Sequence, residues 1–352
     1  MKIFCILSGV HPDLPSEEII SILKAESLLF TIIKRLKQCL VLEIPKESHI
    51  KIINRAAYLK GIYKLLFECP LTNNSIIKAV NNTNLEMEFI DNKTFAVRIE
   101  KSRKKDIKSS FNLNTEELER FIGRLILQKY KNLLKVNLKN PDILFKGFRF
   151  GNQLLFGIEL GKIATAQFQQ RSGPNRPYFH PCGLDAKFAR LMINLAIPKR
   201  RAIIYDPHCG IGSILIEAGF LGYKTIGSDI NWKMINGSLI NLNYYRIQNF
   251  EILRADSRFI PFRKVDHIIT DPPYGRSSPI KGTSIINLYE KFLKQCKDII
   301  HNNNRIVFAA PKIYSEKIES IVKNLDFELV NLFELYVHKS LIRNLWIIKL
   351  PN

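Results

Sequence analysis

The sequence predicts an α/β protein in which a mixed α+β region precedes a mainly parallel, doubly wound sheet. From residue 202 onward, short apolar runs alternate with helical patterns, which is typical of parallel strands joined by crossover helices. A polar segment at 169–177 with one glycine and two prolines interrupts the chain before this stretch, because proline continues neither a helix nor a central strand. We therefore expect an N-terminal region at 1–165, a linker at 166–176 and a C-terminal domain at 177–352.

The N-terminal region is predicted to begin with a buried strand at 2–8. Ser16 is the expected N-cap of a helix that reaches about Glu26. Residues 47–68 have helical spacing, and a capped helix is expected at 115–130. Further strands are expected at 39–44, 95–99, 134–138 and 154–160.

The C-terminal domain is predicted to begin with an amphipathic helix at 185–196. After it come the alternating segments that predict the parallel sheet. They are 202–205, 213–221, 224–228, 232–245, 251–254, 265–270, 285–300, 304–309 and 313–323.

The charge balance is strongly basic. The 352 residues include 53 Lys and Arg against 32 Asp and Glu, a formal net charge of +21. Such a surface attracts polyanions, and nucleic acid is the first candidate. An AT-rich genome that favours lysine would give the same balance. The run at 101–108, with five basic residues in eight, fits either a solvated loop or a phosphate contact.

Cysteine spacing and hydropathy exclude several classes of protein. The six cysteines never form a Cys-x-x-Cys pair, which argues against a disulfide framework and against a zinc or iron–sulfur site. No stretch approaches the about 20 uninterrupted apolar residues of a membrane span. No small-residue cleavage signal follows the first ten residues. We therefore expect a soluble, cytoplasmic protein without a metal.

The first candidate site is Asp206-Pro-His-Cys-Gly-Ile-Gly212, where a strand ends in an acid, a glycine turn follows and a helix begins. Gly210 and Gly212 would let a ligand approach the backbone closely. Leu215 stands where a dinucleotide fingerprint has its third glycine, and the Gly-Lys-Ser/Thr of a phosphate loop is absent. Asp206 would repel a pyrophosphate and attract a cationic ligand.

Two further acids end the next strand-like runs. Asp229 is positioned to hold both hydroxyls of a ribose, and Asp256 to accept a hydrogen bond from an exocyclic adenine amine. With Asp206, they lie at the carboxyl edge of the expected sheet, where ligands of such folds bind. Each acid alone also fits a turn or a helix cap.

Asp271-Pro-Pro-Tyr274 follows the strand-like run at 265–270. The two prolines stiffen the backbone and remove two N–H donors, which leaves carbonyl groups free to accept hydrogen bonds. Together with Asp271 they would hold a donor such as an aromatic amine, and Tyr274 offers a ring on which a heterocycle can stack. A tight turn after a strand is the structural alternative. The segment resembles the [Asp/Asn]-Pro-Pro-[Tyr/Phe] motif of S-adenosylmethionine-dependent amino-methyltransferases.

Further segments are similar to THUMP-containing tRNA guanine-N2 methyltransferases, above all to the archaeal type that acts on guanosine 10. The similarity covers about 171–350. It includes 176–196, the turn at 206–212, the strand end at 227–230, 271–276, and a closing hairpin around 336–341. The segments 3–9 and 135–142 resemble the ferredoxin-like and THUMP modules of that family.

The resemblance implies a Rossmann-like class I methyltransferase with a seven-stranded, mainly parallel sheet and a terminal hairpin, preceded by a ferredoxin-like and THUMP region. It implies S-adenosyl-L-methionine as cofactor and tRNA as partner. The catalytic residues would be Asp271, Pro272, Pro273 and Tyr274. The cofactor-binding residues would be Asp206, His208, Cys209, Gly210, Gly212, Asp229, Ile230, Asp256 and Ser257. The tRNA-binding residues would be Lys101, Arg103, Lys104, Lys105, Arg276 and Lys339.

The implied reaction is methyl transfer to the exocyclic N2 of a guanosine. Asp271 and a proline carbonyl would orient N2, while Tyr274 stacks on the flipped base. His180 and His208 are interpreted as structural or cofactor-lining residues. Another tRNA or rRNA guanosine, adenine N6 of DNA, and a non-catalytic RNA-binding role remain alternatives. We expect a monomer, and a small activator subunit, which some relatives need, remains open.

Overall fold

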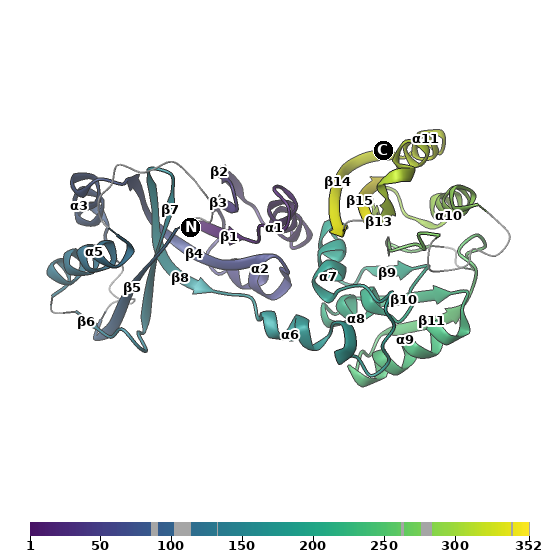
Figure 1. Cartoon of the computed structure of the whole chain (residues 1–352), viewed down its shortest axis with the longest axis horizontal. Coiled ribbons are helices and arrows are strands. Elements are labelled where there is room, and N and C mark those ends of the chain that lie inside the picture. The colour runs from purple at the N-terminus through teal and green to yellow at the C-terminus, as the bar shows by residue number, and fades with distance from the viewer. Residues whose placement is uncertain are drawn as a thin grey trace. The chain divides into compact units, whose positions relative to one another are not determined.

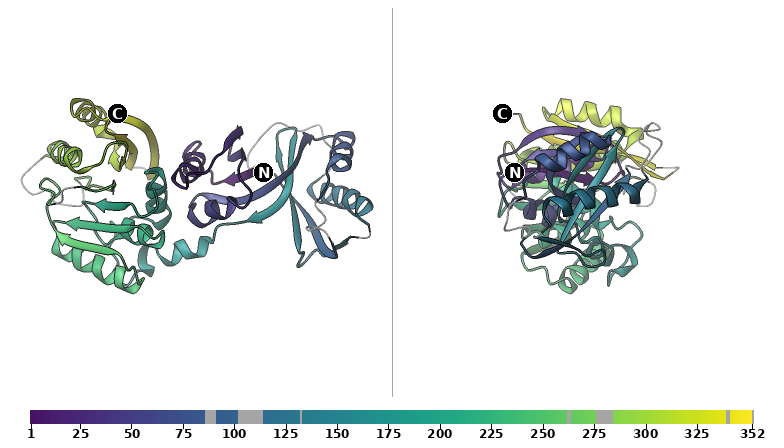
Figure 2. Two further views of the ribbon diagram at one scale, coloured as in Figure 1. Left: turned by 180° about the vertical axis from the view of Figure 1, so that it is seen from behind. Right: turned by 90° about the vertical axis from the view of Figure 1, so that its left-hand side faces the viewer.

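The computed structural model describes residues 1–85, 91–101, 114–131, 133–261, 264–275, 284–338 and 341–351. The chain forms two compact units (Figures 1 and 2). The N-terminal unit comprises Met1–Leu7, Phe30–His49 and Lys60–Lys162, and the C-terminal unit comprises Ser8–Leu29, Ile50–Leu59 and Ile163–Asn352. Among the described residues, no helix combines the length and the apolar character needed to cross a membrane.

The N-terminal unit is built on an eight-stranded sheet with the order β2-β3-β1-β4-β8-β7-β5-β6. Most of the pairs are antiparallel, but β5 pairs parallel with β7 and β6. Helices α3 and α5 bury their apolar faces against these strands. The elements are β1 (Lys2–Leu7), β2 (Thr31–Leu36), β3 (Cys39–Glu43), β4 (Leu59–Pro70), α3 (Asn73–Asn82), β5 (Lys93–Lys101), α5 (Thr115–Lys129), β6 (Leu134–Val136), β7 (Ile143–Phe150) and β8 (Gln153–Gly161).

The capped start predicted for the helix at Thr115 is confirmed. Asn114 Oδ1 accepts from the Glu117 N–H at 3.0 Å, and Glu117 Oε2 accepts from the Asn114 N–H at 2.8 Å. These reciprocal bonds satisfy two N–H groups at the helix N-terminus. The expected strands at 134–138 and 154–160 are also present, the first only as the short strand β6.

Two predictions for the first 70 residues are wrong. Residues 47–68 do not form one helix, because α2 (His49–Arg55) ends before β4 begins at Leu59. Pairing with β8 overrides the helical spacing there. Ser16 is not the N-cap of α1 (Leu14–Ala25), since that position is Asp13. Pro15 fits the first turn of a helix, so the helix begins earlier, and the Ser16 hydroxyl donates to the Asp13 carbonyl at 2.6 Å.

The C-terminal unit contains a seven-stranded sheet with the order β11-β10-β9-β12-β13-β15-β14. Its strands are parallel except for β15, which pairs antiparallel with β13 and β14. The predicted class, a mainly parallel sheet closed by a terminal hairpin, is confirmed. The elements after residue 163 are α6 (Thr165–Gln170), α7 (Ala186–Leu195), β9 (Ile203–Asp206), α8 (Ser213–Phe220), β10 (Lys224–Asp229), α9 (Trp232–Tyr244), β11 (Phe250–Arg254), β12 (His267–Thr270), α10 (Ile285–Ile299), β13 (Arg305–Pro311), α11 (Ser315–Asn324), β14 (Glu328–His338) and β15 (Leu341–Lys349).

Both faces of this sheet are buried, as continuous apolar runs predict. Ile204 and Ile269 pack with α7 and α8, whereas their neighbours Tyr205 and Ile268 pack with α10 and α11. The chain leaves β9 toward β10 and β11 and then returns to place β12 on the other side of β9. Ligands of such sheets bind at this reversal, beyond the carboxyl ends of the strands.

The C-terminal unit includes three segments from outside 177–352, so it differs from the division expected from the sequence. One of them contains α1, whose Glu18 is fully buried. The Glu18 carboxylate accepts from the N–H groups of Ala57 and Tyr58 and from Asn194 Nδ2, each at 2.9 Å. Because Asn194 lies on α7, these bonds attach α1 and the segment after α2 (His49–Arg55) to α7 within the C-terminal unit.

Candidate active site

The turn between β9 and α8 requires glycine at two positions. Gly210 has φ of +51° and Gly212 has φ of +84°, a left-handed conformation that other residues rarely adopt. At Gly212 a Cβ would also lie 2.6 Å from the Ser238 Oγ of α9. The turn therefore packs directly against α9, with its backbone at the carboxyl end of β9.

A cavity opens at this end of the sheet. It brings together the glycine turn, the segment before α7 and Asp271. The lining residues are His180, Cys182, Gly183, Leu184, Asp206, His208, Cys209, Gly210, Ile211, Ser213, Ile214, Met234 and Asp271.

Asp206 is the most deeply buried acid of the cavity, with 2% of its surface exposed. Its Oδ1 accepts from the Thr270 hydroxyl at 2.7 Å and from the His208 N–H at 3.1 Å. Burial raises the pKa of Asp206 to about 7, and the nearby Asp229 and Asp271 act in the same direction. A bound cation would offset the cost of ionising this carboxyl group.

His208 belongs to the same hydrogen-bond network. Its Nδ1 lies 3.1 Å from Thr270 Oγ1. Because that hydroxyl donates to Asp206, His208 Nδ1 carries the proton and Nε2 is the acceptor. Burial lowers the pKa of His208 to about 3. Nε2 is buried without a hydrogen-bond partner among the described residues, so a ligand donor in the cavity can use it.

The carboxylate of Asp229 is held by the backbone of two turns. Its Oδ2 accepts from the Gly210 N–H at 3.1 Å and its Oδ1 from the Asn231 N–H at 2.8 Å. Burial raises the pKa of Asp229, while these two hydrogen bonds lower it. The next residue, Ile230, exposes 49% of its surface and is available as an apolar contact.

Asp256 has a partner that the sequence reading did not consider. Arg258 binds both carboxylate oxygens, with Nε 2.9 Å from Oδ1 and Nη2 2.5 Å from Oδ2. These bonds lower the pKa of Asp256. The adjacent Ser257 is buried. A ligand amine would therefore have to share Asp256 with Arg258.

Asp271-Pro-Pro-Tyr274 follows the carboxyl end of β12. The Tyr274 hydroxyl donates to Asp271 Oδ1 at 2.5 Å, and Arg343 Nη1 lies 4.0 Å from Asp271 Oδ2. Burial raises the pKa of Asp271, whereas Arg343 and Tyr274 lower it. Pro272 is buried and Pro273 is partly exposed. Tyr274 thus orients the carboxylate, a contact that its expected stacking role did not include.

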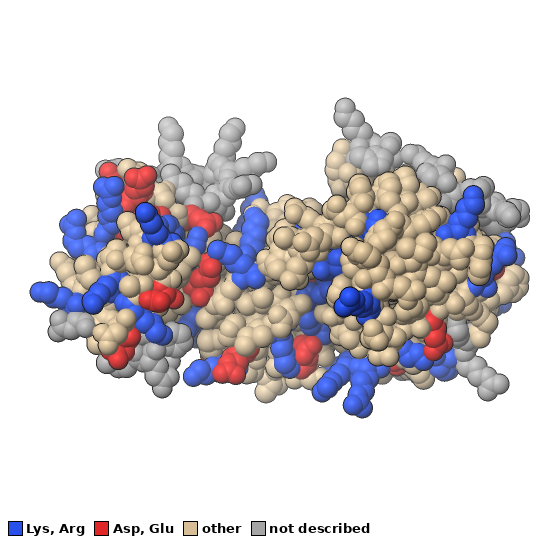
Figure 3. All heavy atoms as spheres, turned by 90° about the horizontal axis from the view of Figure 1, so that it is seen from below, with Lys and Arg blue, Asp and Glu red and all other residues tan. Residues whose placement is uncertain are grey.

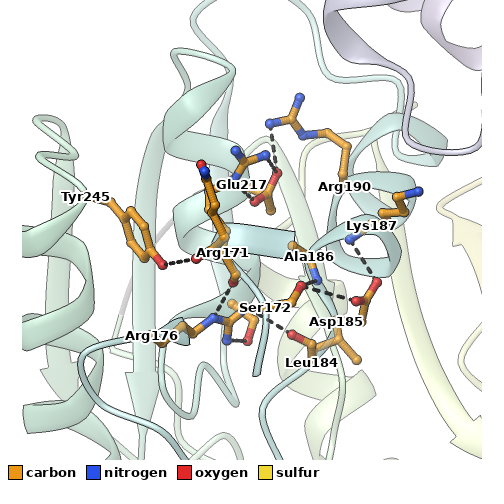
Figure 4. Close-up of polar contacts among 12 residues, drawn as sticks. Arg171, Ser172, Arg176, Leu184, Asp185, Ala186, Lys187, Arg190, Glu217 and Tyr245 are labelled. Carbon is orange, nitrogen blue, oxygen red and sulfur yellow. Dashed lines mark hydrogen bonds and ion pairs between the residues drawn. The ribbon is translucent and has the colours of Figure 1, made fainter. Parts of the chain in front are cut away.

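The segment 171–185, which lines one side of the cavity, is fixed by a buried charge cluster (Figure 4). Glu217 of α8 is completely buried between Arg171, at 2.6 Å, and Arg190, at 2.8 Å. Arg176 donates to the Ser213 hydroxyl at 2.5 Å and to the Leu184 carbonyl at 3.0 Å. Sequence reasoning missed this cluster, since Arg171 and Arg190 are far from Glu217 along the chain and no motif marks them.

The side chains of the residues expected to bind RNA are not among those that the structure describes, so their role stays a prediction. Lys101 ends β5 but its side chain is not among those described. Lys and Arg are spread over the face shown in Figure 3 rather than gathered in one patch. No group of three or more His, Cys, Asp or Glu suited to a metal is found within the described part of the chain. The remaining RNA-binding candidates, Arg103, Lys104, Lys105, Arg276 and Lys339, lie outside the described residues.

The fold and site define a methyltransferase. Residues 174–341 match the family model of an RMKL-like methyltransferase domain, and residues 72–159 match the THUMP domain. The fold is similar to that of TrmN from Thermus thermophilus, with a TM-score of 0.58 at 16% identity and 100% of both chains covered. It is also similar to a putative methyltransferase solved with SAH, with a TM-score of 0.55 at 14% identity, 100% of this chain and 98% of the other being covered.

Relatives with assigned activities narrow the comparison to tRNA guanine-N2 methyltransferases. The chain is 35% identical to a tRNA (guanine(10)-N2)-dimethyltransferase of Methanocaldococcus jannaschii, with 98% of each chain covered. It is 32% identical to the enzyme of that name from Methanothermobacter thermautotrophicus, with 99% of each covered. A tRNA (guanine(6)-N2)-methyltransferase of M. jannaschii is 26% identical, over 69% of this chain and 74% of the other. The chain belongs to the tRNA (guanine(10)-N2)-dimethyltransferase family.

Proposed function

We propose that this protein transfers methyl groups from S-adenosyl-L-methionine to the exocyclic N2 of guanosine 10 in tRNA, giving N2-methyl- and then N2,N2-dimethylguanosine. One observation carries the proposal: Asp271 of the Asp-Pro-Pro-Tyr segment lines the same cavity as Asp206 and the glycine turn. A donor site and an acceptor site thus share one chamber. The names of the full-length relatives support the choice of nucleotide and the second methylation.

The cofactor end of the site, which we define as Asp206, the turn 207–212 and the adjoining Asp229 that accepts from Gly210, fits S-adenosylmethionine. Asp206 is buried and keeps Oδ2 for a cationic group, while the open space beside Gly210 allows close approach to the backbone. Asp229 would accept from the ribose hydroxyls, with Ile230 against the adenine ring. When bound, the cofactor would supply the methyl group of its sulfonium. The electron pair of the broken carbon–sulfur bond would stay on sulfur as the methyl carbon bonds to N2.

The target end, which we define as Asp271 to Tyr274 with Arg343, prepares the nucleophile. Guanine N2 is weakly nucleophilic because its lone pair is delocalised into the ring. Hydrogen bonds from N2–H to Asp271 and to the Pro272 carbonyl would localise and aim that pair. Asp271 then takes the proton that N2 loses. Tyr274 would stack on the base after it leaves the helix.

The test uses the purified full-length protein, S-adenosylmethionine carrying a labelled methyl group, and unmodified tRNA transcripts. Mass spectrometry of the nucleosides should show labelled N2-methyl- and N2,N2-dimethylguanosine, and a transcript with adenosine at position 10 should remain unlabelled. Label at another guanosine would overturn the assignment of the nucleotide. Label in duplex DNA but not in tRNA would overturn the proposed substrate.

Recognition of tRNA is proposed to use the THUMP region and the basic residues expected from the sequence. The match to a THUMP domain at 72–159 and the net charge of +21 support this. We keep the cytoplasm as the place of action and the monomer as the working state. Activity of the purified chain in the assay above, without added protein, would show that no activator subunit is required.

A further inference from the structure

The target end contains a cation that does not belong to the Asp-Pro-Pro-Tyr segment. Arg343 lies on β15, where it is opposite Pro311 of β13 and Leu335 of β14. Its Nη1 is 4.0 Å from Asp271 Oδ2, and its side chain is 15% exposed. The closing hairpin of the sheet therefore brings a guanidinium beside the carboxylate that is proposed to bind the target amine.

Phe188 holds this guanidinium in position. Arg343 Cζ lies 3.8 Å from the centroid of the Phe188 ring. Phe188 is 5% exposed, and its N–H donates to the α7 cap residue Asp185 at 3.1 Å. A ring stacked on the face of a guanidinium limits its rotation but leaves the N–H donors in its plane available.

The donors of Arg343 are not all used by the protein. Nε is buried and has no hydrogen-bond partner among the described residues. The 4.0 Å separation from Asp271 is an ion pair but exceeds hydrogen-bond distance. A buried, unpaired donor on a charged group is costly, and a ligand acceptor would remove that cost.

We propose that Arg343 determines specificity for guanine by donating a hydrogen bond to O6 of the target base. The inference rests on the proposed function, in which Asp271 accepts from N2–H. The Watson–Crick edge of guanine presents two adjacent donors, N2–H and N1–H, and then the acceptor O6. A carboxylate supplies two acceptors and the neighbouring guanidinium supplies a donor. Adenine has an amino group where guanine has O6, so it would place a donor against the guanidinium, which is itself a donor.

Arg343 also keeps Asp271 able to accept. Burial raises the pKa of Asp271, and a protonated carboxyl group would lose an acceptor position. The groups that face Asp271 are Tyr274 on its own segment, Asp206 on β9, Tyr289 on α10 and Arg343 on β15. Arg343 is the cation among these described groups. Without its charge the pKa of Asp271 rises further, and the acid limb of the rate profile moves to higher pH.

The deciding experiment compares two tRNAs assembled by ligation, one with guanosine and one with 2-aminopurine at the target position. 2-Aminopurine keeps the N2 amine but has hydrogen in place of O6 and no proton on N1, so each variant is compared with the wild type on the same base. Arg343→Gln should lower kcat/KM about 10- to 100-fold on guanosine and less than about 3-fold on 2-aminopurine, the size expected for one charge-assisted hydrogen bond. An equal loss on both bases overturns the proposal, because a phosphate contact or a structural role would act on both.

Arg343→Lys separates the hydrogen bond to O6 from the effect of the positive charge on Asp271. It also provides the test if Arg343→Gln does not fold. Lysine keeps the charge but not the planar fork. It should leave the acid limb of the pH profile unchanged while discrimination against 2-aminopurine falls. Retained discrimination, or an acid limb that shifts as far as in Arg343→Gln, overturns the proposal.

Lys349→Gln is the matched control. It removes a positive charge from the other end of β15, where Lys349 pairs with Glu328 at 2.9 Å. It should behave as wild type in both tRNAs, and cofactor binding measured by calorimetry should be unchanged in all three variants. The wild-type protein is assayed on the guanosine tRNA before any variant is compared. Its failure to label that tRNA would refute the proposed function itself.

Discussion

The cofactor end and the target end of the site are built in different ways. At the cofactor end, the carboxylate of Asp206 accepts from the His208 N–H in the turn after β9. The carboxylate of Asp229 accepts from the N–H of Gly210 in that same turn and from the N–H of Asn231 after β10. At the target end, Asp271 is paired with side chains only, those of Tyr274 three positions along and of Arg343 on β15. The cofactor end is held mostly by main-chain N–H groups of two neighbouring β-turn-α units, with the Thr270 hydroxyl as a side-chain donor to Asp206. The target end is assembled from β12, α7 and β15.

This difference shows how one sheet can combine a rigid pocket with an adaptable one. Backbone hydrogen bonds fix the cofactor end before any ligand arrives, and the left-handed Gly210 and Gly212 set its shape. The target end keeps donors that the protein does not satisfy, such as Arg343 Nε. A polar group left unpaired in a buried site is able to discriminate strongly between bases, since only the correct base satisfies it.

The largest effect is expected at the target end. Asp271→Ala should lower methyl transfer about 10³-fold, within the range for loss of a positioned acid–base group, because N2 loses its acceptor. Cofactor affinity measured by calorimetry should stay within a factor of about 3, since the cofactor end does not depend on Asp271 side-chain contacts. Asp326→Ala, which removes an acid that is 77% exposed, is the control and should be fully active. Near-normal turnover of Asp271→Ala would refute the assigned role.

A smaller effect is expected from Asp229→Ala. Loss of the ribose contacts and of the hydrogen bond to Gly210 should weaken cofactor binding about 10- to 100-fold, with a smaller change in kcat at saturating cofactor. Asp256→Ala offers the comparison at the same end. Its carboxylate is already bound by Arg258, so the affinity should change less than about 3-fold. An unchanged dissociation constant for Asp229→Ala would remove it from the cofactor site.

The smallest effect concerns the stability of the protein without cofactor. The pKa of Asp206 is raised to about 7, so its contribution to stability is complete below the unfolded pKa and is lost as pH rises through about 7. Asp206→Asn should therefore be more stable than wild type above that pH, on the order of 1–2 kcal/mol, with the gap closing in acid. Urea unfolding at two pH values measures this difference in stability. The control variant Asp326→Asn should be as stable as the wild type at both. A gap that widens in acid would contradict the prediction.

Much of the cofactor end was predictable from the sequence because it is local. The strand ending at Asp206, the turn with Gly210 and Gly212, and the strand ending at Asp229 are all as expected, since apolar runs and glycine turns act over a few residues. The topology follows from the alternation of strands and helices. The partner of Asp256 was missed although Arg258 is only two positions away, because charge pairs depend on side-chain direction rather than on pattern.

What the sequence determined by itself was the fold class, the order of strands along the chain and the Asp-Pro-Pro-Tyr segment after β12. Only the tertiary structure decided that Arg343 and Phe188 meet beside Asp271, that Glu217 is buried between Arg171 and Arg190, and that α1 packs in the C-terminal unit. These contacts join residues far apart in the chain. Their geometry is set by strand register and by the packing of helices on the sheet, neither of which leaves a periodic signal in the sequence.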